Sequence, residues 1–573
     1  MQSFDYTTLM AVCAELRTDW LPARVEQVYQ SDRMTISMAL RTMKSRGWLE
    51  ISWHPQAARI HIGNPPPRKP DTFTFSQQLI HQLGGLALVE IRSIAAWERV
   101  IDLQFARRPQ EEALYHVYVE IMGKYSNVIL TNHQNEIITV AHQVSQNQSS
   151  LRPLLTGQQY QTPPTQTLTL PSREESLQSW RDRISLIPGS WKKQLLKTYR
   201  GVSPALIQGM LRSANLDLDV TTDTLSDQDW RNLYKLWCEW LGRLEEGNFT
   251  PMTTVDGYNV LGWGGVKSAA NTQELVNQYY TDILNAQNFL QLRHQLQQKL
   301  HSWLEKLHTK AETFQQRLAQ SDRAESYRQN ADLLMAYLHQ WQPGMTEITL
   351  ADFATGQPVT IQLEPDLTAV QNAQKLYKQH QKLKRARVAV EPLLADVEAE
   401  IAYLEQVESA ITQLDTYQTP EDLDAIAEIR DELINQKYLE DSGYRQRSNN
   451  EVSTNFHRFR TPNGFEVWIG RNNRQNDYLT FRVAGDYDLW FHAQEIPGSH
   501  VLLRLEPGAI ADEVDLQYTA NLAAYYSRAR QSEQVPVIYT EPKHVYKPKG
   551  AKPGIAIYKQ ERILWGKPAV CNI

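Results

Sequence analysis

Two long series of apolar residues, spaced three and four positions apart, constrain this chain more than any other feature. Gln, Lys and Glu are frequent at the positions between them. Such spacing is typical of helices that pack against a partner along one seam, as in coiled coils. The first series is Phe289, Leu292, Leu296, Leu300, Trp303, Leu307, Ala311, Phe314 and Leu318. The second series is Leu394, Val397, Ile401, Leu404, Val407, Ile411 and Leu414.

The segment between the two series indicates how these helices are connected. Residues 348–363 alternate between apolar and polar in the manner of short strands. We therefore expect an antiparallel helical arm, with a small insert where the chain turns back. The alternative is two ordinary amphipathic helices in a bundle. Pro392 is predicted to limit how far the second helix extends upstream without a break.

The length of the chain predicts several domains, because 573 residues are too many for one core. We predict an α+β multidomain protein divided into residues 1–170, 171–270, 271–440 and 441–573. The first part is predicted to be mixed α/β, with a helix near 9–16 and strands near 24–30, 51–62 and 117–130. The second part is predicted to hold short helices, one of which begins with Ser203 as N-cap and Pro204 at its first position.

The order of these two parts resembles the fold of formamidopyrimidine-DNA glycosylases. In that resemblance the first part is a glycosylase-like α/β domain, and the second is a helix-hairpin-helix or H2TH-like domain. The last part, residues 441–573, is predicted to be a small α/β module. It is expected to contain a hairpin of strands at 465–469 and 478–483, a helix at 512–530, and strands at 535–539 and 555–558.

The overall charge does not indicate nucleic-acid binding. The net charge is −6 and the isoelectric point is about 6.2, so any such site must be a local basic face on an acidic protein. The three cysteines, Cys13, Cys238 and Cys571, lie far apart and have no metal-ligand spacing. A reducing, cytoplasmic location is expected, with no signal peptide, no membrane span, no metal and no cofactor.

The strongest local concentration of positive charge lies in the C-terminal module. Residues 547–554 contain Lys547, Lys549 and Lys552, held between two prolines and followed by glycine. Prolines reduce the entropy that ordering costs, and lysines on a rigid loop supply affinity for phosphates without sequence specificity. The module is therefore predicted to contact an RNA backbone through this loop. The alternative is a solvated basic loop.

Further candidates in this module lie within and after its first predicted hairpin. Arg471, Asn473 and Arg474 lie in the predicted Asn-rich loop, where the arginines suit phosphate contacts and the asparagines suit turn geometry. His492 is interpreted first as a packing or hydrogen-bonding residue of the fold, and second as an RNA contact. No set of cysteines or acids with ligand spacing accompanies it, so metal chemistry is not predicted.

Two segments of the first domain carry polar residues suited to RNA. Arg99 is suited to reading a phosphate or a base edge, with the adjacent Glu98 aligning its guanidinium through a fork of hydrogen bonds. The alternative is an ordinary surface salt bridge. In the segment 120–127, Gly123 is expected to form a turn. The residues of this segment that we expect to face RNA are Lys124, Tyr125, Ser126 and Asn127.

Four segments, in order along the whole chain, together resemble the NFACT family. The C-terminal block from residue 468 to 558 is similar to the RNA-binding domain of that family. Residues 118–127 resemble its N-terminal signature, with Lys124 and Tyr125 where the family has Arg and His. Residues 372–378 resemble the return segment of its coiled coil. Glu98 and Arg99 occupy the place of a family Asp-Arg pair, with Glu in place of Asp.

The resemblance implies a ribosome-associated factor rather than an enzyme. Such a factor binds a large ribosomal subunit that holds a stalled peptidyl-tRNA, and recruits tRNA, Ala-tRNA in bacteria, for tailing of the nascent chain without mRNA. The peptide bonds are formed by the ribosome, and the protein acts as a monomer. The implied tRNA-binding residues are Glu98, Arg99, Glu120, Lys124, Tyr125, Ser126 and Asn127. The implied rRNA-binding residues are Arg471, Asn473, Arg474, His492, Lys547, Lys549 and Lys552.

Two other functions follow from related resemblances. A DNA glycosylase of this fold uses an N-terminal proline as nucleophile, and this chain begins Met1-Gln2-Ser3, so at most nucleic-acid binding without catalysis is expected. Members of the NFACT family are also labelled fibronectin-binding, which suggests a surface adhesin. Two expectations argue against that role: the chain is expected to have no signal peptide, and it carries a basic loop at residues 547–554.

Overall fold

The computed structural model describes residues 1–67, 70–149, 152–164, 167–440 and 454–571. They form two compact units, Met1–Leu284 and Asn285–Ile573. The predicted border at residues 440 and 441 lies at the edge of a range outside the described residues. No helix in the described ranges combines the length and apolar character needed to cross a membrane.

The first unit is built around a nine-stranded sheet in which all pairs are antiparallel. Its order is β4-β3-β2-β1-β5-β6-β7-β8-β9. The strands are β1 (Ala23–Asp32), β2 (Thr35–Arg41), β3 (Arg46–Ser52), β4 (Arg59–Gly63), β5 (Ala87–Ser93), β6 (Val100–Ala106), β7 (Tyr115–Glu120), β8 (Asn127–Asn132) and β9 (Ile137–Val140). Two helices accompany the sheet, α1 (Tyr6–Asp19) and α2 (Thr74–Leu83). The helix and strands predicted from the first 130 residues are confirmed.

Short helices follow the sheet, and they share its core. They are α3 (Leu177–Ser185), α4 (Trp191–Thr198), α5 (Pro204–Ser213) and α6 (Asp227–Glu246), followed by β10 (Met252–Thr254), β11 (Gly257–Asn259) and β12 (Lys267–Ser268). Ser203 caps α5 and Pro204 is its first residue, as predicted. The Ser203 hydroxyl also donates to Asp5 Oδ2 at 2.5 Å, and Asp5 is the N-cap of α1. The starts of α1 and α5 are therefore tied together.

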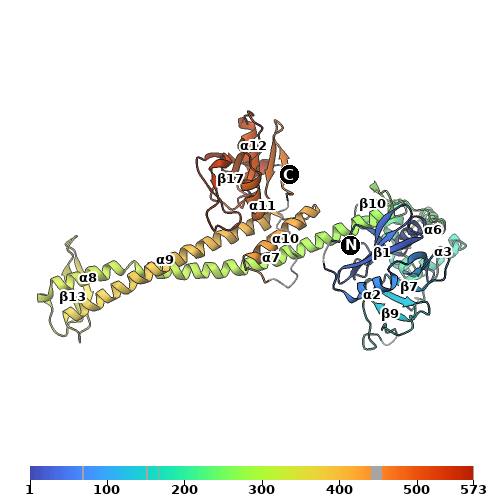
Figure 1. Ribbon diagram of the computed structural model, residues 1–573, viewed down its shortest axis with the longest axis horizontal. Helices are drawn as coiled ribbons and strands as arrows, with labels where there is room; N and C mark the ends of the chain where they lie inside the picture. The colour runs from blue at the N-terminus through green and yellow to red at the C-terminus, as the bar shows by residue number, and fades with distance from the viewer. Residues whose placement is uncertain (68–69, 150–151, 165–166, 441–453, 572–573) are drawn as a thin grey trace. The chain divides into compact units, whose positions relative to one another are not determined.

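Two long helices dominate the first half of the second unit (Figure 1). They are α7 (Thr272–Ser321), which begins in the first unit, and α9 (Ala369–Gln413). Arg293, near the middle of α7, donates to the Ile411 carbonyl of α9 at 3.3 Å, and Asp322, just past the end of α7, pairs with Arg387 at 2.9 Å. The two helices therefore run antiparallel. Their shared core contains most members of both predicted apolar series.

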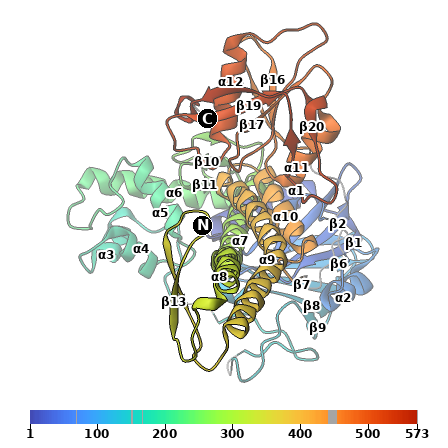
Figure 2. The same cartoon turned by 90° about the vertical axis from the view of Figure 1, so that its left-hand side faces the viewer.

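A small insert connects these helices. It consists of α8 (Ala324–Ala336), β13 (Glu347–Ala351) and β14 (Pro358–Gln362), and the two strands form a hairpin (Figure 2). The strand-like alternation predicted for this segment is confirmed. The expected effect of Pro392 is wrong, because α9 continues through it. Pro392 and Val388 are both exposed, so the Val388 carbonyl that loses its helical partner can bond to water instead.

The C-terminal module contains a six-stranded antiparallel sheet in the order β15-β16-β18-β17-β19-β22. These strands are β15 (His457–Arg460), β16 (Glu466–Ile469), β17 (Leu489–Ala493), β18 (Val501–Leu503), β19 (Val535–Thr540) and β22 (Arg562–Gly566). The helix α12 (Glu513–Tyr525) packs on the sheet, and β20 (Val545–Tyr546) pairs with β21 (Ile557–Tyr558). The helix α10 (Pro420–Asn435) precedes this module.

One predicted strand of this module is helical instead. The helix α11 (Asn473–Tyr478) runs directly into a π-helical turn at Leu479–Val483, where a second hairpin strand was expected. The Asn472 side chain accepts a hydrogen bond from the Gln475 backbone at 2.9 Å and so caps the helix. The expected Asn-rich loop is therefore a helix start, and Leu479 and Thr480 are buried.

Side chains of α9 hold the module in place. Gln406 donates to the Gly498 carbonyl at 2.7 Å, and Gln413 donates to the Tyr526 carbonyl at 2.7 Å. The Ser409 hydroxyl donates to the Pro497 carbonyl at 3.3 Å. All three bonds end on backbone carbonyls of the module, so α9 contacts its main chain at three points. Within the second unit, the end of α9 and the C-terminal module therefore form one connected structure.

Candidate nucleic-acid interface

The loop between β5 and β6 holds residues 97–99 in an unusual conformation. Trp97 has a φ of 65°, which is a rare backbone state for a bulky residue. Its ring lies between the rings of Tyr6 and Trp240, with centroids 5.0 Å and 5.3 Å away. Because this aromatic packing fixes Trp97, it also fixes the positions of the two following residues.

The expected fork between Glu98 and Arg99 is wrong. Glu98 Oε1 instead lies 3.4 Å from Nη1 of Arg200, in the turn after α4. Arg99 Nη1 donates to the Phe4 carbonyl at 3.1 Å. Burial lowers the pKa of Arg99, whereas the charges of Asp5 and Glu98 oppose that fall.

The second N-terminal segment divides into an inner and an outer part. The carboxylate of Glu120 is buried, where it pairs with Arg152 and accepts a hydrogen bond from the Tyr160 hydroxyl at 2.9 Å. Ser126 Oγ donates to the Gly123 carbonyl at 2.7 Å, and Asn127 Nδ2 donates to the His142 carbonyl at 2.7 Å. These side chains support the turn itself.

The outer part of that segment faces solvent. The Tyr125 side chain is 71% exposed, and Lys124 Nζ lies 5.0 Å from the centroid of its ring. A cation beside an exposed ring is a suitable surface for a base and its phosphate. Of the predicted residues in this segment, Lys124 and Tyr125 are therefore the exposed ones.

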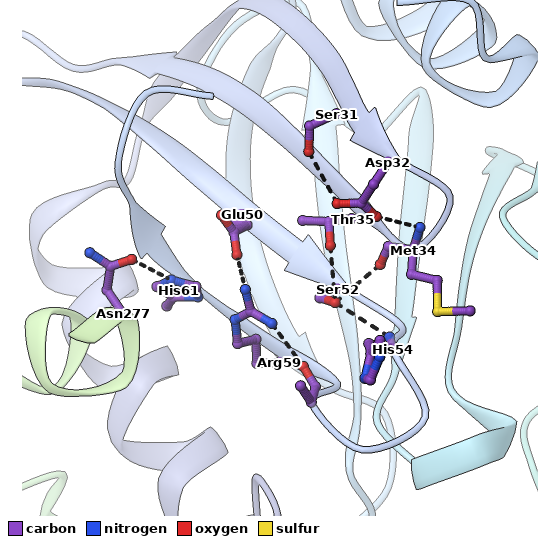
Figure 3. A network of polar contacts seen from close by, with 11 residues as sticks. Ser31, Asp32, Met34, Thr35, Glu50, Ser52, His54, Arg59, His61 and Asn277 are labelled. Carbon is purple, nitrogen blue, oxygen red and sulfur yellow. Dashed lines mark hydrogen bonds and ion pairs between the residues drawn. The ribbon is translucent and has the colours of Figure 1, made fainter. Parts of the chain in front are cut away.

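A buried polar network, which the sequence did not indicate, lies under β3 and β4 (Figure 3). Arg59 pairs with Glu50 and donates to the Ala57 carbonyl at 3.0 Å, and its guanidinium lies 5.4 Å from the ring centroid of Tyr280. His61 Nε2 lies 3.3 Å from Asn277 Oδ1. Burial lowers the pKa of His61 to about 4, so the imidazole is neutral at ordinary pH. The network joins the sheet to the first turns of α7.

The predicted residues at the start of α11 are engaged within the protein. Arg471 Nη1 donates to Asp422 Oδ1 of α10 at 2.5 Å. Asn473 is buried and donates to Glu432 Oε1 at 3.2 Å. Burial raises the pKa of Glu432 to about 7, while hydrogen bonds from Tyr403 and Asn473 oppose that rise. Arg474 is half-buried, and its charge also favours the carboxylate of Glu432.

The Lys-rich loop at residues 547–554 is anchored at both ends. Lys547 pairs with Asp477, whose Oδ1 also accepts a hydrogen bond from the Gly554 backbone at 3.1 Å. Lys552 Nζ lies over the rings of Tyr403 and Tyr438, 4.5 Å and 4.8 Å from their centroids. These contacts hold the loop against α9 and the end of α10.

Glycine is required where this loop returns. Gly554 has a φ of 82°, and a Cβ atom there would lie 2.5 Å from Asn473 Oδ1. The loop is therefore pressed against the start of α11, and Lys549 remains exposed at its outer side. Nearby, Tyr546 is 47% exposed, and Lys559 Nζ lies 5.8 Å from its ring centroid. This outer surface of the module carries both basic and aromatic side chains.

His492 lies among other aromatic side chains in the sheet of the module. Its ring stacks on Trp490 at 5.7 Å and meets His500 edge-on at 5.4 Å. Burial lowers the pKa of His492 to about 4. The described part of the chain contains no group of three or more His, Cys, Asp or Glu residues that could hold a metal ion. The first interpretation, a residue that packs within the fold, agrees with this placement.

Comparison with known proteins gives two family matches in sequence order. The model of the "NFACT N-terminal and middle domains" matches residues 5–452, and that of the "NFACT protein RNA binding domain" matches residues 455–559. The Rqc2 homolog RqcH of Bacillus subtilis is 30% identical, over 99% of this chain and 98% of the relative. The Rqc2 homolog RqcH of Streptococcus suis is 31% identical, over 98% of this chain and 97% of the relative.

A solved structure is also similar to part of the chain. It is the C-terminal part of the fibronectin/fibrinogen-binding protein of Streptococcus suis, with 32% identity and a TM-score of 0.37. The similarity covers 49% of this chain and 95% of that structure.

Proposed function

Because the chain belongs to the NFACT family, we propose that it acts in ribosome quality control. In this proposal it binds a large ribosomal subunit that still carries a stalled peptidyl-tRNA. It recruits a further tRNA, Ala-tRNA by family resemblance, for tailing of the nascent chain without mRNA. The tail marks the chain for degradation. The observation that supports this role most strongly is the similarity to RqcH proteins over nearly the full length, with both family matches in sequence order.

The proposal assigns a role to each predicted domain. Residues 1–170, a glycosylase-like domain, and residues 171–270, a helix-hairpin-helix or H2TH-like domain, hold the tRNA. Residues 271–440 form a coiled-coil arm that provides reach across the subunit, which the 50-residue α7 and the 45-residue α9 support. Residues 441–573 bind rRNA.

The tRNA site is centred on Glu98 and Arg99, with Lys124 and Tyr125 as further contacts. Glu120, Ser126 and Asn127 contribute by shaping the turn that carries them, as their internal hydrogen bonds support. The guanidinium of Arg99 is held by its hydrogen bond to the Phe4 carbonyl. A guanidinium held in this way suits a phosphate or a base edge, because its hydrogen-bonding geometry is fixed in advance.

The rRNA site is the outer face of the Lys-rich loop. Lys549 supplies charge there, and Tyr546 offers a ring for stacking on an unpaired base. The other residues predicted for this site act mainly as supports, since Arg471, Asn473, Lys547 and Lys552 have partners within the protein. The protein positions RNA and does not itself form peptide bonds, which remain the ribosome's reaction.

The test is affinity purification from cells followed by RNA sequencing. Enrichment of large-subunit rRNA together with tRNA is expected, and the identity of the tRNA names the residue that is added. The variant Glu98→Ala/Arg99→Ala should lose tRNA while it keeps the subunit. A matched control is Glu90→Ala/Arg92→Ala, which removes an exposed ion pair of β5 (2.7 Å) and should keep both RNAs.

Two results would contradict the proposal. Recovery of the protein without large-subunit rRNA would exclude the ribosomal role. Surface exposure in a cell fractionation, without co-sedimentation with ribosomal subunits, would instead favour the fibronectin-binding alternative. If the Glu98→Ala/Arg99→Ala variant loses the subunit rather than the tRNA, this pair has a different role from the one proposed.

A further inference from the structure

The turn at residues 199–201 is built against the strained Trp97. Gly201 has a φ of 75°, and a Cβ atom there would lie 2.6 Å from Trp97 Cε3. Only glycine fits so close to the ring in this backbone state. Tyr199 fixes the other side of the turn, since its ring lies 4.8 Å from that of Trp237 and its hydroxyl donates to Glu175 Oε2 at 2.6 Å. Two segments far apart in sequence therefore determine each other's shape.

Polar atoms at this junction are incompletely satisfied. The ion pair between Glu98 and Arg200 is long, at 3.4 Å, and the two side chains are only 20% and 14% exposed. Glu98 Oε1 and Arg200 Nε are both buried, and neither has a hydrogen-bond partner within the described ranges. If this ion pair served only stability, both atoms would be expected to have hydrogen-bond partners, because an unsatisfied buried polar atom lowers the stability of the fold.

Strain and unsatisfied groups together point to a site prepared for a ligand. Strained backbone concentrates at binding sites, where the surrounding structure holds it in place, as Tyr6 and Trp240 do here for Trp97. Arg200 keeps an N–H donor without a partner in the described ranges, and a guanidinium donor of this kind is complemented by an anionic acceptor. In a protein that binds RNA, that anion is a phosphate of the backbone.

We infer that Arg200 is a phosphate-binding residue of the tRNA site and that Glu98 is its positioning residue. The inference rests on the proposed function and extends it, because it brings the turn after α4 into a site otherwise made by the sheet. Glu98 holds the guanidinium of Arg200 from one side and leaves other nitrogens of its planar fork for a phosphate. Arg99, which donates to the Phe4 carbonyl, lies beside this pair in the chain.

The test measures tRNA affinity of the full-length protein over a series of salt concentrations. Each phosphate contact contributes about 0.7 to 0.9 to the slope of log affinity against log salt. Arg200→Gln is expected to weaken binding roughly tenfold and to lower that slope by about this amount. The matched control is Arg173→Gln, because Arg173 forms an exposed pair with Glu245 at 2.9 Å. The control should leave affinity and slope unchanged.

Glu98 is tested by the variants Glu98→Gln and Glu98→Asp. Glu98→Gln is expected to weaken binding without lowering the slope, since no phosphate contact is removed, and Glu98→Asp should restore most of the affinity. In an Arg200→Gln background most of the effect of Glu98→Gln should disappear, because the ion pair through which Glu98 positions Arg200 is gone. Near-ultraviolet circular dichroism checks that each variant is folded.

The possible outcomes separate the inference from the proposed function. If the wild-type protein does not bind tRNA, the proposed function fails. If the wild type binds and Arg200→Gln binds equally well, or binds more weakly with an unchanged slope, the inference about Arg200 is overturned. Should Arg200→Gln fail to fold, Glu98→Gln decides: wild-type affinity in that variant overturns the positioning role.

Discussion

Replacing Arg471 by alanine is expected to loosen α11 from α10, and to affect RNA binding only through that change. The Arg471 and Asp422 side chains are 12% and 9% exposed, so the ion pair between them is buried. Removing one partner of a buried pair costs about 3 to 5 kcal/mol, because the other charge is left uncompensated. Asp422 keeps hydrogen bonds from the backbones of Gln418 and Thr419, both at 2.9 Å. We therefore expect the lower value, about 3 kcal/mol.

Hydrogen exchange measures this effect locally, without unfolding the whole chain. A loss of about 3 kcal/mol corresponds to roughly 100-fold faster exchange of the backbone amides in α10 and α11. Asp422→Asn/Arg471→Ala should recover part of the protection, because an asparagine at the third position of α10 still accepts hydrogen bonds from the preceding backbone and carries no charge. Arg460→Ala is the control, because it removes an exposed cation of β15 that pairs with Glu466 at 3.6 Å, and it should leave exchange in α10 and α11 unchanged. If Arg471→Ala abolishes RNA binding while exchange stays at the wild-type rate, Arg471 contacts RNA directly and the reasoning is refuted.

Three further predictions concern the second unit. Burial raises the pKa of Glu432 from 4.5 to about 7, so the contribution of this one group to stability is greatest below pH 4.5 and falls by about 3 kcal/mol as pH rises to 7; in urea unfolding measured at several pH values, Glu432→Gln should remove this contribution. Lys549→Ala should lower the slope of log RNA affinity against log salt concentration by about 0.7 to 0.9. Lys552→Ala should instead lower the unfolding temperature, because Lys552 lies over two tyrosine rings. Pro392→Ala should slow amide exchange in the middle of α9, since it restores a helical hydrogen bond and proline costs up to about 3 kcal/mol there.

The parts of the fold that the sequence predicted well are those set by local periodicity. The apolar spacing of α7 and α9 reports burial along one face, and the same residues form their shared core. The predicted break at Pro392 is wrong because the cost of a proline in a helix depends on whether the freed carbonyl reaches water. The sequence does not show this. The strand predicted at residues 478–483 is wrong for a different reason. The aromatic and β-branched residues there favour a strand, but the cap at Asn472 and burial against the sheet favour a helix.

The candidate site was harder to predict, because a sequence shows which residues are cations but not which cations are free. Lys549 and Lys552 are equivalent in the sequence, yet Lys552 lies over two tyrosines, one of them 114 positions away along the chain. Glu98 was assigned to its neighbour Arg99, but its partner comes from the turn after α4. Each of these pairings depends on tertiary contacts between distant segments. The proposed binding surface therefore depends on which charges the fold leaves accessible, and a basic motif alone overstates it.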